Sequence, residues 1–139
     1  MLFNNLRMGF PLGIAGAASA TNLITNGGFD TDTAWTKGAG WTIAGGVAVG
    51  TATAEQLRQD PGIFLGIQYR VSYDLTITSG DCHVFVRFGD FAGIARTTSG
   101  SYSEDFTAGS NDDGGVLGFG KKNEATFTGT IVNVSLIQI

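Results

Sequence analysis

The chain has 139 residues, including 22 glycines, 8 basic and 12 acidic residues, with a net charge of −4. This length fits one domain, and glycine without a Gly-X-Y period, beside only 2 prolines, excludes collagen. The scattered basic residues form no positive stripe and no apolar run reaches the roughly 20 residues of a bilayer span, so neither nucleic acid nor membrane is an expected partner.

Residues 1–21 are apolar, and we expect them to form an extended docking arm ahead of the domain. The segment carries one charge, Arg7, and its glycines and proline disfavour a helix. The residues expected to make the arm's interface are Leu2, Phe3, Leu6, Met8, Phe10, Leu12 and Ile14. Two alternatives stay open: a signal-like segment ending at Ala18-Ser19-Ala20, and an arm folded back on its own domain.

From Asn22 onward the sequence predicts short strands separated by turns. The clearest covers residues 67–78, where apolar and polar residues alternate strictly, as in a strand with one buried face. Cys82–Phe88 follows the turn at Ser79–Asp81, and we expect these two strands to form a hairpin. The other expected strands are Asn22–Thr25, Trp41–Ala44, Val47–Ala52, Glu55–Gln59, Ile94–Thr97, Tyr102–Thr107, Val116–Gly120 and Ala125–Ile137.

The spacing of these strands indicates the fold class. Turn residues recur between them, and no segment has the 3.6-residue periodicity of a long helix. Many short strands with regular turn signals are typical of an all-β antiparallel sandwich or barrel.

Several motifs occur in the order found in a known superfamily. The segment 22–30 reads NLITNGGFD and is followed by Trp35, residues 40–48 read GWTIAGGVA, and residues 129–136 read GTIVNVSL. This series resembles carbohydrate-binding-module-like jelly rolls of the galactose-binding-like superfamily. The resemblance implies an all-β antiparallel sandwich (jelly roll) over residues 22–139, preceded by the N-terminal arm. Phe29, Trp35 and Trp41 are expected in its core.

The resemblance also implies a role. The glycine-rich version of the fold is similar to domains of bacteriophage virion proteins. It implies a non-enzymatic structural accessory protein located in the virion, most plainly capsid decoration or cement, or else a tail or neck component. The partners would be major capsid or tail subunits, and we expect a homo-oligomer. The alternative is a carbohydrate-binding adhesion module that contacts host-surface glycans.

A surface patch is expected on the strand after Cys82. Strand alternation places His83, Phe85 and Arg87 on the solvent side, where an aromatic ring would be flanked by polar groups. Such a patch suits either a sugar or a subunit interface. Phe64 and Phe91 lie in predicted loops and carry the same two interpretations.

No cofactor is expected, and structural calcium is weakly indicated. Domains of this superfamily often hold the ion near the first turn and the last strand, which makes Asp30 and Asp32 candidate ligands. Calcium takes six to eight oxygen ligands, and the last-strand position that is commonly Asp is Val132 here.

Catalysis is not expected. The chain has one Cys and one His, and because Cys82 and His83 are neighbours on a strand, their side chains point to opposite faces. Cys82 is expected to be a small buried apolar residue. No nucleophile-elbow, zinc-protease or phosphate-loop motif is present in the sequence.

Overall fold

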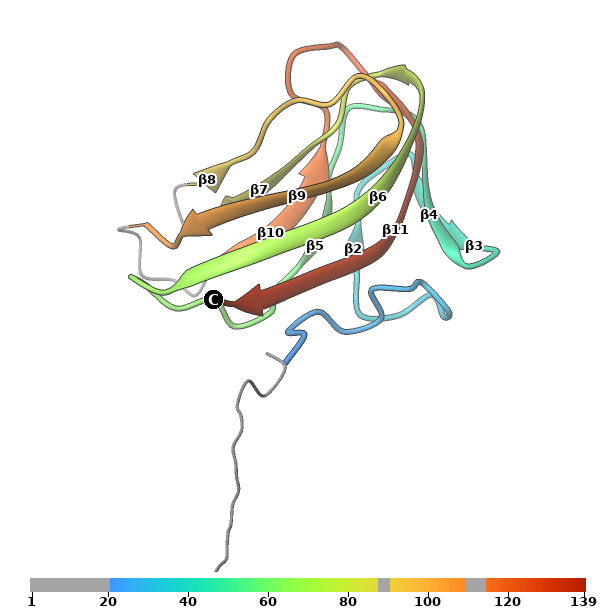
Figure 1. The fold of residues 1–139 in the computed structure, drawn as a ribbon. Coiled ribbons are helices and arrows are strands. Elements are labelled where there is room, and N and C mark those ends of the chain that lie inside the picture. Colours follow the sequence, from blue (N-terminus) through green and yellow to red (C-terminus); the bar gives the residue numbers. More distant parts are fainter. Residues whose placement is uncertain (1–20, 88–90, 110–114) are drawn as a thin grey trace, which may run out of the picture.

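Two antiparallel β-sheets pack face to face in the computed structural model, which describes residues 21–87, 91–109 and 115–139 (Figure 1). One sheet, here the β10 sheet, consists in spatial order of β2 (Thr36–Lys37), β5 (Leu57–Gln59), β10 (Val116–Gly120), β7 (His83–Arg87) and β8 (Phe91–Ala92). The other, the β11 sheet, consists of β3 (Trp41–Ala44), β4 (Val47–Thr53), β11 (Phe127–Gln138), β6 (Gln68–Gly80) and β9 (Gly100–Thr107). The predicted all-β antiparallel sandwich is confirmed.

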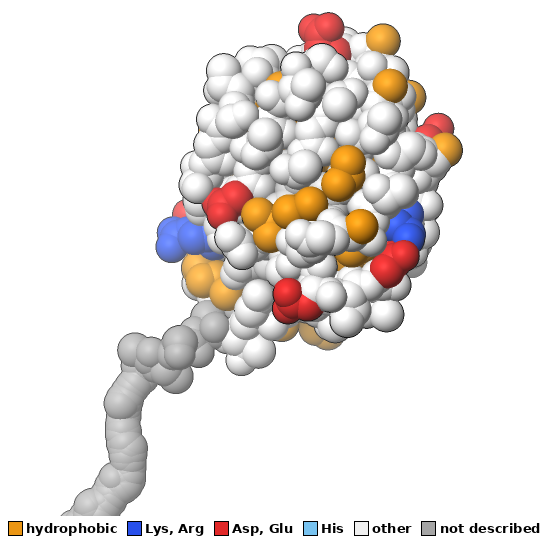
Figure 2. Space-filling view, turned by 90° about the vertical axis from the view of Figure 1, so that its right-hand side faces the viewer, with side chains coloured by type: hydrophobic (Ala, Val, Ile, Leu, Met, Phe, Trp, Pro, Cys, Tyr) orange, Lys and Arg blue, Asp and Glu red, His pale blue; other side chains and the backbone are white. Residues whose placement is uncertain are grey.

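The described residues form no helix, so none crosses a membrane as a helix. The interface residues predicted in the N-terminal arm lie outside the described residues, as does all of the arm except Thr21. Charged side chains are few and scattered on the side of the molecule that Figure 2 shows, in keeping with a content of 14% charged residues.

Strand β6 follows the period-two pattern of its sequence. Tyr69, Val71, Tyr73 and Leu75 are buried, whereas the residues between them point away from the core. The strand pairs with β11 on one side and β9 on the other, so it lies inside its sheet. The alternation therefore identified both the strand and its buried face.

The hairpin predicted between the 67–78 and 82–88 strands is wrong. β6 belongs to the β11 sheet and β7 to the β10 sheet, so the chain crosses between the layers after Gly80. The backbone of Gly80 has φ = +79°, and Asp81 beyond it is buried. Alternation shows which face of a strand is buried, but it carries no information about the strand's hydrogen-bonding partner.

The hairpin between β3 and β4 shows local turn chemistry. Gly45 and Gly46 have φ angles of 64° and 79°, and two consecutive positive φ angles are typical of the type I′ turn that suits twisted antiparallel strands. The register pairs Ala44 with Val47, which leaves only the two glycines in the loop.

Some strand boundaries differ from those predicted. Ile94–Thr97 is not a strand, although Arg96 forms an isolated bridge with Cys82. Asn22–Thr25 is not a strand either; the Leu23 N–H donates to the Leu136 carbonyl and holds this segment beside β11. The two-residue strands β2 and β8 were not predicted, because two residues are too few to show a periodicity.

The turn after residue 25 has an unexpected backbone. Left-handed φ angles occur at Asn26 (56°) and Phe29 (55°), not at the intervening glycines. Gly27 is required for another reason, since a Cβ there would collide with the Val134 carbonyl oxygen. The Val134 N–H donates to the Gly27 carbonyl over 3.0 Å, so the absent side chain lets this turn dock on the last strand.

One continuous core fills the space between the sheets. Phe29 packs against Trp35 with ring centroids 5.2 Å apart, and Trp35 continues to Phe119 at 6.4 Å. Trp41 stacks on Phe127 at 5.5 Å near the β3–β4 end. Trp35 and Trp41 donate their indole N–H groups to backbone carbonyls, which satisfies their polar atoms inside the core.

Candidate functional site

The outer face of the β10 sheet carries a row of residues that crosses all five strands. The register pairs Ala92 with Phe85, Phe85 with Gly118, Gly118 with Arg58, and Arg58 with Thr36. In β5, β7 and β10 the residues on either side of the row are buried, so the row itself points to the opposite face of the sheet. We call these five residues the Arg58 row.

Phe85 is not the exposed aromatic that the sequence predicts. Only 6% of its surface is accessible. A Cβ on Gly118 would lie 2.8 Å from Cε2 of Phe85 and closer still to its Cζ, so the phenyl ring occupies the space that the glycine leaves empty. The expected open platform is thus replaced by a ring packed onto the sheet.

His83 lies beside Phe85, with ring centroids 5.3 Å apart. Its Nδ1 is 2.9 Å from the Gly120 carbonyl oxygen, and because a carbonyl can only accept, Nδ1 carries the proton and Nε2 remains an acceptor. Burial lowers the pKa of His83 below its ordinary value, outweighing the opposing effect of the Gly120 hydrogen bond. His83 is therefore a neutral, oriented imidazole at pH 7.

Arg58 is the polar group of this face that the sequence reasoning missed. It lies between buried Leu57 and Gln59 on β5, and it is partly buried itself. Its Nε is buried and has no hydrogen-bond partner in the structure. Arg87, at the end of β7, is exposed and already has an interaction of its own. The alternation of Leu57, Arg58 and Gln59 was the signal that could have placed Arg58 on the face.

The outer face of the β11 sheet is polar in a different way. Arg70 donates from Nε and Nη2 to the two oxygens of Asp105 at 2.7 and 2.9 Å. Asp74 accepts hydrogen bonds from Asn133 and Ser101, each at 2.7 Å, and these hold its pKa below the ordinary value. A shallow groove on this face is lined by Ser72, Tyr73, Asp74, Ser101, Tyr102, Ser103 and Asn133. The charged side chain of this groove, Asp74, therefore already has hydrogen-bond partners.

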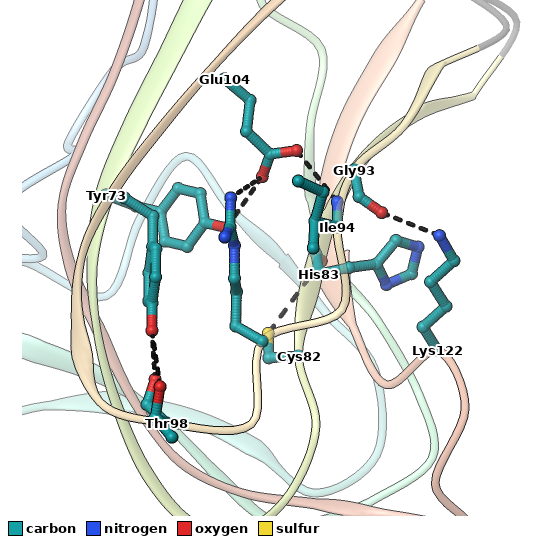
Figure 3. Close-up of polar contacts among 10 residues, drawn as sticks. Tyr73, Cys82, His83, Gly93, Ile94, Thr98, Glu104 and Lys122 are labelled. Atoms are coloured by element: carbon teal, nitrogen blue, oxygen red, sulfur yellow. Dashed lines mark hydrogen bonds and ion pairs between the residues drawn. The ribbon is translucent and has the colours of Figure 1, made fainter.

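A charged cluster lies under the segment that links β8 to β9 (Figure 3). The Glu104 carboxylate accepts hydrogen bonds from the Ile94 N–H at 2.9 Å and the Tyr73 hydroxyl at 3.2 Å, and lies 3.4 Å from Arg96 Nη2. The Arg96 guanidinium lies 4.3 Å from the centroid of the Tyr102 ring. These contacts hold the segment against β6 and β9, so the cluster has a structural role.

Cys82 and His83 do not form a nucleophile and base. Cys82 is fully buried, and its Sγ contacts the His83 carbonyl oxygen at 4.0 Å rather than the imidazole. Burial raises the pKa of the Cys82 thiol, which disfavours the reactive thiolate. Asp81, next in the chain, is also occupied, because its carboxylate accepts the backbone N–H groups of Lys122 and Asn123, each at 2.8 Å.

The two candidate calcium ligands have other surroundings. Lys37 Nζ binds both carboxylate oxygens of Asp32, at 2.6 and 2.7 Å. The Asn26 amide donates to the carbonyls of Thr31 and Thr33 at 2.6 and 3.0 Å, and its oxygen accepts the Asp30 N–H at 3.0 Å. A side-chain amide thus fills the centre of this turn. The described residues contain no group of three or more His, Cys, Asp or Glu that could hold a metal ion.

The large exposed apolar side chains lie outside the Arg58 row. Phe64 is 71% exposed, beside Leu65 at 56%, in the loop between β5 and β6. The loop is held in place, since the Phe64 N–H donates to the Tyr69 hydroxyl at 2.9 Å. Phe91 instead stacks on Phe106 at 4.5 Å and is partly buried.

The fold and its core define a jelly-roll β-sandwich of the kind seen in carbohydrate-binding modules. The CBM22-1 xylan-binding domain from Paenibacillus barcinonensis matches with a TM-score of 0.66 at 11% identity, over 86% of this chain and 96% of that one. A CBM4 structure matches with a TM-score of 0.57 at 17% identity, over 84% and 99% of the two chains.

An arabinose-bound GH51 α-L-arabinofuranosidase also matches, with a TM-score of 0.51 at 14% identity. The match covers 84% of this chain but only 26% of the enzyme chain. No protein-family model and no curated protein matches the sequence. At these identities the likeness establishes the fold, and nothing in it points to a phage particle.

Proposed function

We propose that this protein is a non-catalytic carbohydrate-binding domain. The observation that carries the proposal is the match to nearly the whole length of a xylan-binding domain, in a chain whose described residues form two five-stranded sheets around one core. The buried Cys82 and the occupied carboxylates of Glu104 and Asp81 favour binding over catalysis. This proposal corresponds to the alternative role predicted from the sequence, a carbohydrate-binding module, and not to the virion role.

The binding surface in this proposal is the outer face of the β10 sheet. The Arg58 side chain has no hydrogen-bond acceptor among the described residues, and its Nη groups can donate to a ligand. The ring of Phe85 covers Gly118, Gly120 carries no side chain, and His83 adds an acceptor at Nε2. Sugars present hydroxyl groups that can bind such a set of fixed donors and acceptors.

A glycan array probed with the full chain tests the proposal. At least one class of oligosaccharide should bind, and isothermal titration should show binding weakened about tenfold or more in Arg58→Gln, because a hydrogen-bonded charged group is lost. Arg70→Gln is the matched control, since it removes the same charge from the other sheet. Absence of binding to every glycan, or equal losses in both variants, would overturn the proposal.

The virion role is a separate prediction. It depends on the arm of residues 1–21, and a carbohydrate-binding domain displayed on a particle would satisfy both roles. Deleting residues 1–20 should leave a folded sandwich that no longer enters particles, whereas normal incorporation of the truncated protein would contradict the arm's docking role.

A further inference from the structure

The four arginines of the described residues differ in their partners. Arg70 is paired with Asp105, Arg96 with Glu104, and Arg87 has an interaction of its own. The side chain of Arg58 has neither a hydrogen bond nor an ion pair with the described residues, and its Nε is buried. A guanidinium that is partly removed from water and has no acceptor is costly to the folded protein.

The residues around Arg58 do not supply that acceptor. Its cross-strand neighbours are Thr36 on one side and Gly118 on the other, followed by Phe85 and Ala92. None of these carries a charge. The carboxylate next in the sequence after β5, Asp60, accepts the Gly62 N–H at 3.1 Å and so turns into its own loop.

We infer that the ligand of this face is an anionic glycan, whose sugar carboxylate or sulfate binds Arg58. This inference rests on the proposed carbohydrate-binding function and adds the class of sugar. The Nε of Arg58 is buried, so the donors to an outside ligand are the two Nη groups at the end of the planar guanidinium, which match the two oxygens of a carboxylate or sulfate. A sugar hydroxyl has one oxygen and can accept from only one of them at good geometry.

The overall charge of the protein makes the inference specific. With a net charge of −4, the chain as a whole does not attract polyanions. An acidic glycan that binds must therefore gain its affinity locally, at a positive group with a free hydrogen-bonding edge. Among the described residues, Arg58 is the arginine whose side chain has neither an ion pair nor a hydrogen bond. The Nε of Arg96 is also buried without a partner, but the Nη2 of that arginine lies 3.4 Å from Glu104.

Isothermal titration with three sets of oligosaccharides of equal length tests the inference. One set carries uronic acids, one carries sulfate esters and one is neutral, such as xylo-oligosaccharides. The acidic sets should bind about ten- to a hundredfold more tightly than the neutral set, because a charge-assisted pair replaces a neutral hydrogen bond. Whichever acidic set binds more tightly identifies carboxylate or sulfate as the recognised group.

Variants of one residue separate charge from geometry. Arg58→Gln should bring the acidic sets down to the neutral affinity, Arg58→Lys should fall between, and Arg70→Gln should behave as the unmodified protein. Equal affinity for neutral and acidic sets, or a preference that persists in Arg58→Gln, would overturn the inference while leaving the proposed function standing. If no set binds at all, the proposed function itself fails.

Discussion

The outer faces of the two sheets use the same kinds of residue in opposite ways. On the β11 sheet, Arg70 has its carboxylate and Asp74 has two hydrogen-bond donors, so the polar groups are satisfied by one another. On the β10 sheet, Arg58 faces glycine, threonine and a phenyl ring, and its Nε has no acceptor. The first face satisfies its own polar groups, whereas the second face is the one that we propose binds a glycan.

The glycines of the two sheets sharpen this contrast, and the glycine of β11 gives the largest expected effect on stability. A Cβ on Gly129 of β11 would collide with the Thr76 carbonyl oxygen, which is backbone and cannot move away cheaply. A Cβ on Gly118 of β10 would instead meet the ring of Phe85, a side chain. We expect Gly129→Ala to lower the free energy of unfolding by about 3 kcal/mol and Gly118→Ala by about 1 kcal/mol.

Urea unfolding of both variants measures the difference. Phe85→Ala is itself destabilising, because the ring is buried. The double variant Gly118→Ala/Phe85→Ala should nevertheless lose less than the sum of the two single losses, since the ring no longer competes for the space, whereas the losses of Phe85→Ala and Gly129→Ala should add. If Gly118→Ala lowered the free energy of unfolding as much as Gly129→Ala, the Phe85 ring could not move aside for the added methyl group, which would contradict this prediction.

The charged cluster at Glu104 gives the next largest effect. Glu104→Gln should lower the free energy of unfolding by about 2 kcal/mol, because Arg96 loses its carboxylate and the Ile94 and Tyr73 donors keep only a weaker neutral acceptor. Asp105→Asn on the same strand is the control; its pair with Arg70 is solvent-exposed, and we expect little change. If the two variants lowered the unfolding temperature equally, burial of the Glu104 cluster would contribute no extra stability, and this prediction would be wrong.

The smallest expected effect is a pH dependence on the β11 face. Hydrogen bonds from Asn133 and Ser101 lower the pKa of Asp74 in the folded protein. The stability from the ionised Asp74 is therefore present above its unfolded pKa of about 4 and is lost as pH falls through the lower folded value. Asp74→Asn should be less stable than the unmodified protein at neutral pH and match it in acid, as measured by urea unfolding at both pH values. A gap that is the same in acid would contradict this assignment.

Much of the fold could be predicted from local patterns. The alternation in residues 67–78, the glycine pair at 45–46 and the composition rich in Gly, Thr and Val determine strands, a tight turn and an all-β sandwich. They do so because backbone preferences and the direction of successive side chains depend on near neighbours. The burial of Phe29, Trp35 and Trp41 is expected from the resemblance to the jelly-roll superfamily, and the structure confirms it.

The candidate site was decided by the tertiary structure. Which sheet a strand joins depends on hydrogen bonds to distant segments. For this reason β6 and β7 lie in different sheets, although they are neighbours in the chain. Phe85 is buried because Gly118, 33 positions away in the printed sequence, lies opposite it. Arg58 lacks an acceptor among the described residues for the same reason. Its cross-strand neighbours come from two other strands and cannot be predicted from the residues next to it in the sequence.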